Sequence, residues 1–234
     1  MIISSFLDPA LGSAPASDSV IGLTERKCSQ CGETFIGFGV SLCDPCQTRR
    51  REAEISKGKA AMEFHNSFPA RAKRDTASMT GPSLAKAKTL LPLLKNGSGP
   101  VLILLGDRGT GKTVMATWMA GMLGFGCYTK AFDLFADIKK TYAANAKTTE
   151  DQVLRRYYQA GFLVIDEAQE RKESEWENTI LTNLIDKRYD ALKPTVIIAN
   201  LKEEALNGCL GASILSRAQR TAGGLVVCDW PAYV

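Results

Sequence analysis

The chain has 234 residues and seven cysteines, and its 29 basic and 25 acidic residues give a formal net charge of +4. Apolar residues make up 45% and charged residues 23%, a composition that is typical of a globular protein and excludes a largely disordered chain. So small a charge allows nucleic acid as a partner without demanding it. The length suits one medium-sized domain with a small appendage.

Residues 1–25 are rich in Ser, Ala, Pro and Gly, and we expect them to form a flexible tail. No basic stretch precedes its apolar residues, and Asp8 and Pro9 interrupt these early, so a secretory signal is not expected. No stretch of the chain reaches the roughly 18 apolar residues that a membrane helix needs. We therefore expect a cytoplasmic protein with no membrane partner, where paired cysteines bind metal rather than form disulfides.

Two Cys-x-x-Cys pairs, Cys28 with Cys31 and Cys43 with Cys46, define a small domain expected over residues 26–46. Each pair can supply two thiolates to a tetrahedral ion, so the spacing predicts a structural Zn²⁺ held by all four cysteines. A redox dithiol is the alternative, and the presence of two matched pairs argues against it. A segment this small cannot bury enough surface to fold alone, so the metal would drive its folding.

Residues 47–79 form an expected charged helical linker between two domains. From residue 47 to residue 74, eight Arg and Lys residues outnumber three Glu residues. The helix should extend to about Phe64 and break before Pro69, because the residue before a proline avoids the helical conformation. The linker is either a solvated helix or a surface for nucleic acid or a partner, and the charge pattern leaves both open.

From residue 80 onward, apolar runs alternate with helical patterns, and we expect one α/β domain over residues 80–234. Buried strands that alternate with helices imply a parallel sheet with helices on both faces. The predicted strands span 100–106, 126–130, 162–166, 194–200 and 224–230. The predicted helices span 84–97, 113–124, 131–146, 152–160, 175–192 and 211–220.

A glycine-rich loop directly follows the first of these strands and precedes a helix. It matches the pattern G-x-x-x-x-G-K-(S/T) in the strand–loop–helix context that this phosphate-binding motif requires. Its backbone amides and the helix N-terminus would cradle a nucleoside triphosphate, whereas an ordinary glycine turn would bind nothing. Lys112 would reach the β- and γ-phosphates, and the Thr113 hydroxyl would ligate Mg²⁺. The loop residues are Gly106, Asp107, Arg108, Gly109, Thr110, Gly111, Lys112 and Thr113.

Polar residues end the next two long apolar strands. Asp166 and Glu167 follow Phe162–Ile165, and a parallel strand delivers such residues to the ligand-binding edge of the sheet. We expect Asp166 to hold Mg²⁺ and Glu167 to polarise the attacking water, although the pair could instead cap a helix. Asn200 ends the later strand and would orient the same water, or else stabilise a turn.

With Ser216-Arg217, these motifs resemble the AAA+ ATPases, and more specifically the DnaC-like replicative helicase loaders and the related IstB-like ATPases. The resemblance extends over about residues 66–233. Each motif alone is only modestly specific, but the motifs together are specific for this family. The resemblance implies an AAA+ fold and an ATPase that uses ATP and Mg²⁺. The stretches that carry it are FPAR (68–71), AFDLFADIKKTY (131–142), FLVIDE (162–167), WENTILTNLIDKRYDALKPTVIIAN (176–200) and LGASILSRAQRTAGGLVVCDWPAY (210–233).

The resemblance also assigns roles to single residues. Arg217 corresponds to the catalytic arginine finger that reaches the ATP of a neighbouring subunit; Arg220, one turn further, competes for that role, and a plain surface arginine is the alternative. Tyr142, Ser174 and Trp176 correspond to positions that contact single-stranded DNA, where an aromatic ring stacks on any base. Tyr142 could instead pack in the core.

One departure from the family pattern concerns hydrolysis. In DnaC relatives the Trp-x-x-Tyr near the end is followed by an arginine, called sensor II, whereas WPAY is followed here by Val234. We therefore expect hydrolysis that is slow or dependent on DNA or a partner, unless another basic residue takes the place of this arginine.

The implied function is ATP-dependent loading of a DnaB-type replicative helicase onto single-stranded DNA during replication, by an ATP-bridged oligomer or spiral. The first alternative is an IstB-like ATPase that assists a transposase on DNA, and the second is a zinc-dependent DNA-binding module whose ATP site is only structural. The cysteine domain and the aromatic positions favour the loader, and Asp166-Glu167 argues against a purely structural site. The cysteine domain could bind helicase, bind DNA through Arg49–Arg51, or only stiffen the terminus.

Overall fold

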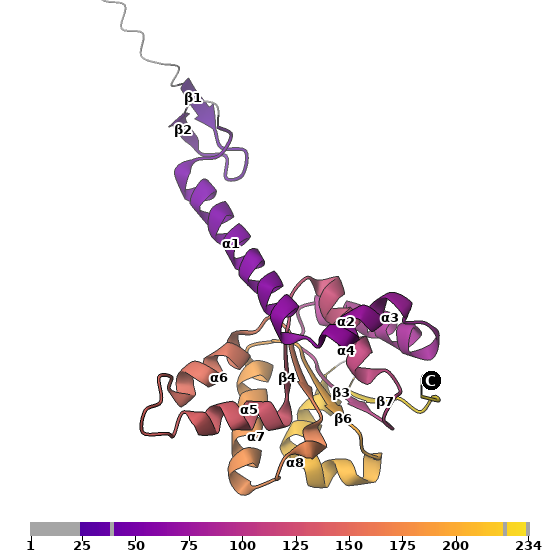
Figure 1. The fold of residues 1–234 in the computed structure, drawn as a ribbon. Helices are drawn as coiled ribbons and strands as arrows, with labels where there is room; N and C mark the ends of the chain where they lie inside the picture. The colour runs from indigo at the N-terminus through magenta and orange to yellow at the C-terminus, as the bar shows by residue number, and fades with distance from the viewer. Residues whose placement is uncertain (1–23, 38–39, 222–223, 233–234) are drawn as a thin grey trace, which may run out of the picture. The chain divides into compact units, whose positions relative to one another are not determined.

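The computed structural model describes residues 24–37, 40–221 and 224–232, without the side chains of 59–66. Most of the expected tail and the residues after Ala232 lie outside these ranges. The chain divides into two compact units, residues 1–55 and 56–234, each of which is described by itself (Figure 1). Within the described ranges, no helix has the length and apolar character to cross a membrane.

The first unit contains a short hairpin and the start of a long helix. Strands β1 (Thr24–Lys27) and β2 (Thr34–Gly37) pair antiparallel, and helix α1 (Asp44–Ser67) begins at the second cysteine pair and extends into the second unit. Three of the four paired cysteines are buried and form a small cluster with Phe35 and Leu42 against it. The hairpin was not predicted, since its eight residues are mostly exposed and carry no apolar alternation.

The second unit is built on a parallel five-stranded sheet. The spatial order is β4-β5-β6-β3-β7, so the first strand of the sheet in sequence lies between the last two. The final strand is shorter than the predicted 224–230, because ladder pairing with its neighbour ends at Val227 opposite Leu105. The strands are β3 (Val101–Leu105), β4 (Cys127–Lys130), β5 (Leu163–Asp166), β6 (Thr195–Ala199) and β7 (Leu225–Val227).

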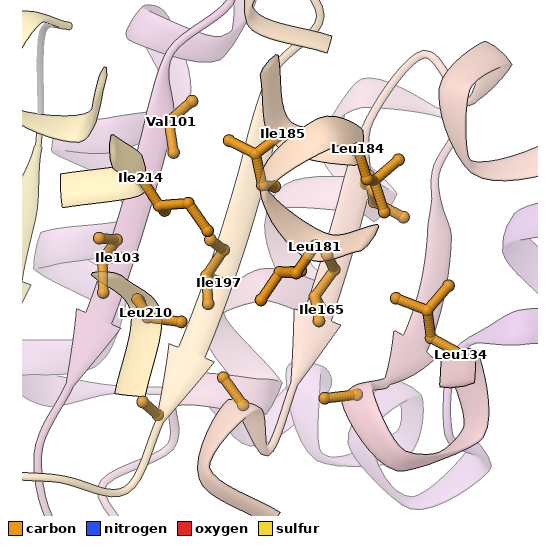
Figure 2. Close-up of a cluster of buried hydrophobic side chains, with 14 of the residues drawn as sticks. Val101, Ile103, Leu134, Ile165, Leu181, Leu184, Ile185, Ile197, Leu210 and Ile214 are labelled. Atoms are coloured by element: carbon orange, nitrogen blue, oxygen red, sulfur yellow. The ribbon is translucent and has the colours of Figure 1, made fainter. Parts of the chain in front are cut away.

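Apolar side chains cover both faces of this sheet, which is why its central strands read as continuous apolar runs. In β3, Val101, Ile103 and Leu105 face one layer, and Leu102 and Leu104 face the other. Figure 2 shows part of the first layer, in which strand residues such as Ile165 and Ile197 meet helix residues such as Leu181 and Ile214. The helices of that layer are α5 (Ala131–Lys140), α6 (Glu150–Gln159), α7 (Glu175–Asp190) and α8 (Glu203–Arg220). The opposite layer contains α3 (Gly81–Lys95) and α4 (Lys112–Leu123).

Two helices differ from the predicted bounds. Helix α5 ends at Lys140 rather than residue 146, because residues 143–149 offer no large apolar side chain to anchor another turn to the core. Helix α8 begins eight residues before the predicted start, and Gly211, with a φ of 78° and a ψ of 157°, kinks it in the middle. The glycine that seemed to begin a helix therefore joins two of them.

Residues 68–79, which the sequence assigns to the linker, pack in the second unit. Helix α2 (Ala70–Asp75) follows Pro69, and a 3₁₀ turn, η1 (Thr76–Ser78), follows α2. Phe68 is 3% exposed and its ring centroid lies 5.4 Å from that of Tyr128, while Met79 is buried in the same apolar layer. This segment therefore supplies part of the wall around the site described next.

Candidate functional site

The predicted phosphate-binding loop connects β3 with α4. Gly106, Gly109 and Gly111 have φ angles of 131°, 85° and 84°, which only glycine adopts without strain. Helix α4 begins at Lys112, so its free N-terminal amides face the loop. The backbone thus forms the concave, amide-lined turn that suits anionic ligands.

Lys112 lies inside this loop and is only 4% exposed. Its Nζ donates to the carbonyl oxygens of Gly106 at 2.8 Å and Asp107 at 2.7 Å, and also contacts the Thr110 hydroxyl. Burial lowers the pKa of Lys112, against the opposing effect of nearby acidic groups that include Asp166. The ammonium is therefore fixed by the same loop whose phosphate ligand it is predicted to bind.

Asp166 is the centre of a buried polar cluster at the end of β5. Its Oδ2 accepts hydrogen bonds from the Thr113 hydroxyl at 2.6 Å and the Tyr128 hydroxyl at 3.0 Å, and its Oδ1 accepts the Glu167 backbone N–H at 2.7 Å. Burial raises the pKa of Asp166, and these hydrogen bonds act in the opposite direction. Burial also raises the pKa of Tyr128, so its hydroxyl stays a donor.

Glu167 and Asn200 lie at the same edge of the sheet. Glu167 has a φ of 53°, a left-handed conformation that is uncommon for this residue, and its carboxylate pairs with Lys130 at 3.0 Å. The Asn200 backbone N–H donates to the Gln169 side-chain oxygen at 3.0 Å, which ties the end of β6 to the turn after β5.

A cleft of about 690 Å³ joins these groups to the 68–79 segment. The loop, the acidic pair and Asn200 come together in one place because each ends or follows a parallel strand. Along the chain, 53 residues separate Thr113 from Asp166 and 34 separate Asp166 from Asn200. The lining residues are Pro69, Arg71, Ala72, Arg74, Asp75, Ser78, Met79, Ser83, Arg108, Gly109, Gly111, Lys112, Thr113, Val114, Asp166, Glu167 and Asn200.

The four paired cysteines form a second candidate site, in the first unit. All four sulfur atoms lie within 4.8 Å of one another, and the Sγ atoms of Cys31 and Cys43 are 3.6 Å apart. Backbone N–H groups of Cys31 and Cys43 lower the pKa of Cys28 to about 6, which favours its thiolate. The structure thus brings together all four residues that the spacing predicts as ligands.

Similarity to known proteins agrees with this geometry. The family model for IstB-like ATP binding protein matches residues 89–219, which is more than half of the chain. The chain belongs to the IstB-like ATP-binding protein family. The predicted AAA+ fold is confirmed, and so is the resemblance to DnaC loaders at the level of homology.

Relatives of this IstB-like protein include the replicative helicase loader DnaC of Escherichia coli, 28% identical over 142 residues that make up 59% of this chain and 58% of that one. DnaC of Buchnera aphidicola is 27% identical over 135 residues, 56% of this chain and 55% of that one. The chain thus spans a little over half the length of these relatives. In both, the matched region is a part of the protein rather than the whole.

Solved structures share the fold at low sequence identity. The DnaC helicase loader crystal structure has a TM-score of 0.53 at 22% identity and covers 63% of this chain and 91% of that one. The DnaI crystal structure has a TM-score of 0.56 at 18% identity, covering 68% and 93%. DnaA bound to AMPPCP and single-stranded DNA has a TM-score of 0.53 at 19% identity, covering 67% and 50%.

In this IstB-like protein, the predicted arginine finger is held by its own chain. The Arg217 guanidinium lies 2.6 Å from an Asp186 carboxylate oxygen and 5.8 Å from the centre of the Tyr189 ring, and it donates to the Ser213 hydroxyl. Arg220, the competing candidate, is exposed. Arg217 does not line the cleft of its own chain.

The predicted DNA-contacting residues cluster beyond the end of α5. Tyr142 is 56% exposed rather than part of the core, and its ring centroid lies 6.2 Å from that of Trp176. The Lys139 ammonium lies 5.1 Å from the Trp176 ring centre. Ser174 caps α7 by accepting a hydrogen bond from the Glu177 backbone N–H.

Several residues that line the cleft or contact its acidic pair were not predicted from the sequence. Tyr128 and Lys130 contact the acidic pair because β4 lies beside β5, with Lys130 directly opposite Asp166 in the register. Arg71 and Arg74 reach the cleft because α2 packs on α4. No motif marks these four residues, although Arg71 falls within the FPAR stretch that carries the family resemblance.

Proposed function

We propose that this chain is an ATPase that loads a DnaB-type replicative helicase onto single-stranded DNA. The observation that supports this most is the convergence of the phosphate-binding loop, Asp166, Glu167 and Asn200 on one cleft, in a chain whose named relatives are DnaC loaders. We place its action in the cytoplasm, where replication proteins meet their DNA.

ATP would bind with its phosphates along the loop amides and beside the Lys112 ammonium, where buried donors act at low dielectric. Glu167 would accept the proton of the attacking water after its carboxylate separates from Lys130, and Asn200 would orient that water. The ion pair is partly exposed, so separating it costs little. Lys112 and Asp166 are themselves buried, so their charges would act on the ligand with little screening by water.

The Thr113 hydroxyl and the Asp166 carboxylate fit a bound Mg²⁺. Their oxygen atoms lie 2.6 Å apart at the mouth of the loop, and oxygen is the ligand type that Mg²⁺ prefers. Mg²⁺ held there would supply positive charge against the β- and γ-phosphates.

The four cysteine sulfurs fit a structural Zn²⁺. Four thiolates within 4.8 Å of one another match a closed tetrahedral site, which supplies folding energy and leaves no position open for a substrate. The exposed run Arg49–Arg51 lies within α1 and offers charge for DNA phosphates or for an acidic helicase surface.

Self-assembly would complete the catalytic site. We propose that Arg217 leaves Asp186 when two copies meet and reaches the ATP of its neighbour, where it stabilises the charge that develops on the γ-phosphate. The spiral so formed would hold single-stranded DNA against Tyr142 and Trp176, with Lys139 near the ring and Ser174 at the start of α7.

Native mass spectrometry with the replicative helicase encoded by the same genome, ATP and Mg²⁺ tests this function. We expect several copies of the chain on each helicase hexamer, retained longer by Glu167→Gln because that variant binds ATP without hydrolysing it. The matched control is Glu204→Gln, an exposed position on α8 outside the cleft. Absence of any complex with the helicase would contradict the loader function.

The arginine finger has its own test. We expect Arg217→Ala to lose about 10³-fold in DNA-stimulated ATP hydrolysis while it still binds ATP. Arg220→Ala is the matched control, one helical turn away and exposed. If Arg220→Ala loses ATP hydrolysis and Arg217→Ala keeps it, the finger is Arg220. If neither variant loses activity, the chain has no arginine finger on this helix.

The family description also supports a second function, that of an IstB-like ATPase that assists a transposase. Assembly of the chain on duplex DNA with ATP, together with the absence of a helicase complex, would favour this function. A transposase gene beside that of this chain would support it further.

A further inference from the structure

The described residues after β7 lie directly against the phosphate-binding loop. The Cys228 backbone N–H donates to the Leu105 carbonyl at 2.7 Å, at the point where the loop begins. A Cβ placed on Gly106 would lie 2.3 Å from the Cys228 carbonyl oxygen, and one on Gly109 would lie 2.9 Å from the Ala232 Cβ. The loop is therefore in close contact with a segment that is more than 100 residues away in sequence.

A side-chain hydrogen bond from Trp230 also connects this segment to the loop. The Trp230 indole Nε1–H donates to the Thr110 carbonyl oxygen at 2.8 Å, across 120 residues of sequence. Its ring is partly buried and packs against the same apolar layer as Leu102 and Leu104. A ring fixed by packing holds its N–H in one direction, so the bond constrains the loop rather than following it.

This bond sets the orientation of one loop amide. In a trans peptide the C=O and N–H groups point in opposite directions, and the described residues contain no cis peptide. Because the Thr110 carbonyl points to Trp230, the N–H of Gly111 in the same peptide points away from it. Gly111 lines the cleft beside Lys112 and Thr113.

We propose that Trp230 is a positioning residue for nucleotide binding, which holds the Thr110–Gly111 peptide so that its N–H faces the phosphates. The inference rests on the proposed binding of ATP at this loop. Loop amides of this motif cradle the α- and β-phosphates, which ADP retains. Removal of the indole N–H therefore weakens ATP and ADP alike and acts on KM more than on kcat.

The test is calorimetric titration of the full chain with Mg·ATP and with Mg·ADP. Trp230→Phe keeps an aromatic ring and deletes the donor, and Trp118→Phe, on the middle of α4 with its ring in a different groove, is the matched control. We expect Trp230→Phe to weaken both nucleotides about three- to tenfold, the effect of one hydrogen bond, and the control to stay within twofold.

A smaller loss than threefold in a folded Trp230→Phe variant overturns the inference while the proposed function stands. Binding of neither nucleotide by the unaltered chain overturns both. If Trp230→Phe does not fold, the Trp118→Phe/Trp176→Phe double variant decides, since it leaves Trp230 as the one tryptophan of the chain. Saturation with Mg·ADP is then expected to change the emission of Trp230, and unchanged emission overturns the inference.

Discussion

The two units of the chain obtain their stability in different ways. The body over residues 56–234 buries two apolar layers against a parallel sheet, so the hydrophobic effect is the main favourable contribution to its folding. In the described part of the first unit, the buried cluster consists of three cysteines with two partly buried neighbours. The comparison shows that the body buries two large apolar layers, whereas the described part of the first unit buries little beyond its cysteines.

Metal removal should produce the largest difference in stability between the two units. We expect a chelator, or Cys43→Ser, to unfold residues 24–43 completely, because the structural ion supplies the folding energy of such a segment. The body should keep its unfolding temperature. Metal analysis and proteolysis would measure this: the chain should hold one zinc ion, and Cys209→Ala, a buried cysteine of the body, should keep it. A hairpin that survives chelation would contradict the comparison.

A substitution at Arg188 should do the opposite, because it should destabilise the body and leave the cysteine unit unchanged. Arg188 is fully buried, and it donates to the carbonyls of Tyr157, Ala160 and Pro194 at 2.7 to 2.8 Å. Burial lowers the pKa of Arg188 to about 10, so the side chain remains charged at neutral pH.

We expect Arg188→Leu to lower the free energy of unfolding of the body by about 3 kcal/mol, because it leaves buried carbonyls without donors. Urea unfolding would measure the loss, and zinc content should not change. The control Arg155→Leu removes an exposed ion pair with Asp151 and should cost less than about 1 kcal/mol.

Nucleotide should stabilise the body and not the cysteine unit. At a hundredfold excess over Kd, Mg·ATP is expected to add about 2.7 kcal/mol to the unfolding free energy of the body. Lys112→Ala should lose this gain, whereas Lys88→Ala, exposed on α3, should keep it. Thermal unfolding with and without nucleotide is the measurement. Equal stabilisation of both variants would show that the nucleotide does not bind at this loop.

The smallest expected effect is a gain. Burial raises the pKa of Asp166 above its unfolded value, so the ionised side chain lowers native stability at neutral pH. Asp166→Asn should therefore stabilise the body by about 1 kcal/mol at pH 7, as exchanges at strained functional sites often do.

The gain of Asp166→Asn should shrink as the pH falls through the raised pKa of Asp166 and vanish below the unfolded value, where both states bind the proton. Unfolding of the unaltered chain and of Asp166→Asn across this pH range would measure it. Asp190→Asn, exposed at the end of α7, serves as the control. A gain that persists at low pH would mean that desolvation of Asp166 is not its cause.

The sequence by itself determined the features that contiguous residues encode. The predicted strands correspond to the five strands of the parallel sheet, and the loop, the acidic pair and Asn200 lie at the ends of three of them as the sequence places them. The two cysteine pairs predicted a cluster that the structure brings together. These predictions succeed because a buried parallel strand and a glycine-rich loop each have a local signature.

Only the tertiary structure decided which distant residues complete the site. Lys130 meets Glu167 and Tyr128 meets Asp166 because β4 lies beside β5, and Trp230 reaches Thr110 because β7 lies beside β3. Strand order and register depend on how whole layers pack, and no local pattern records them. The residues proposed to act in the cleft could thus be identified along the chain, but the side chains that orient them could not.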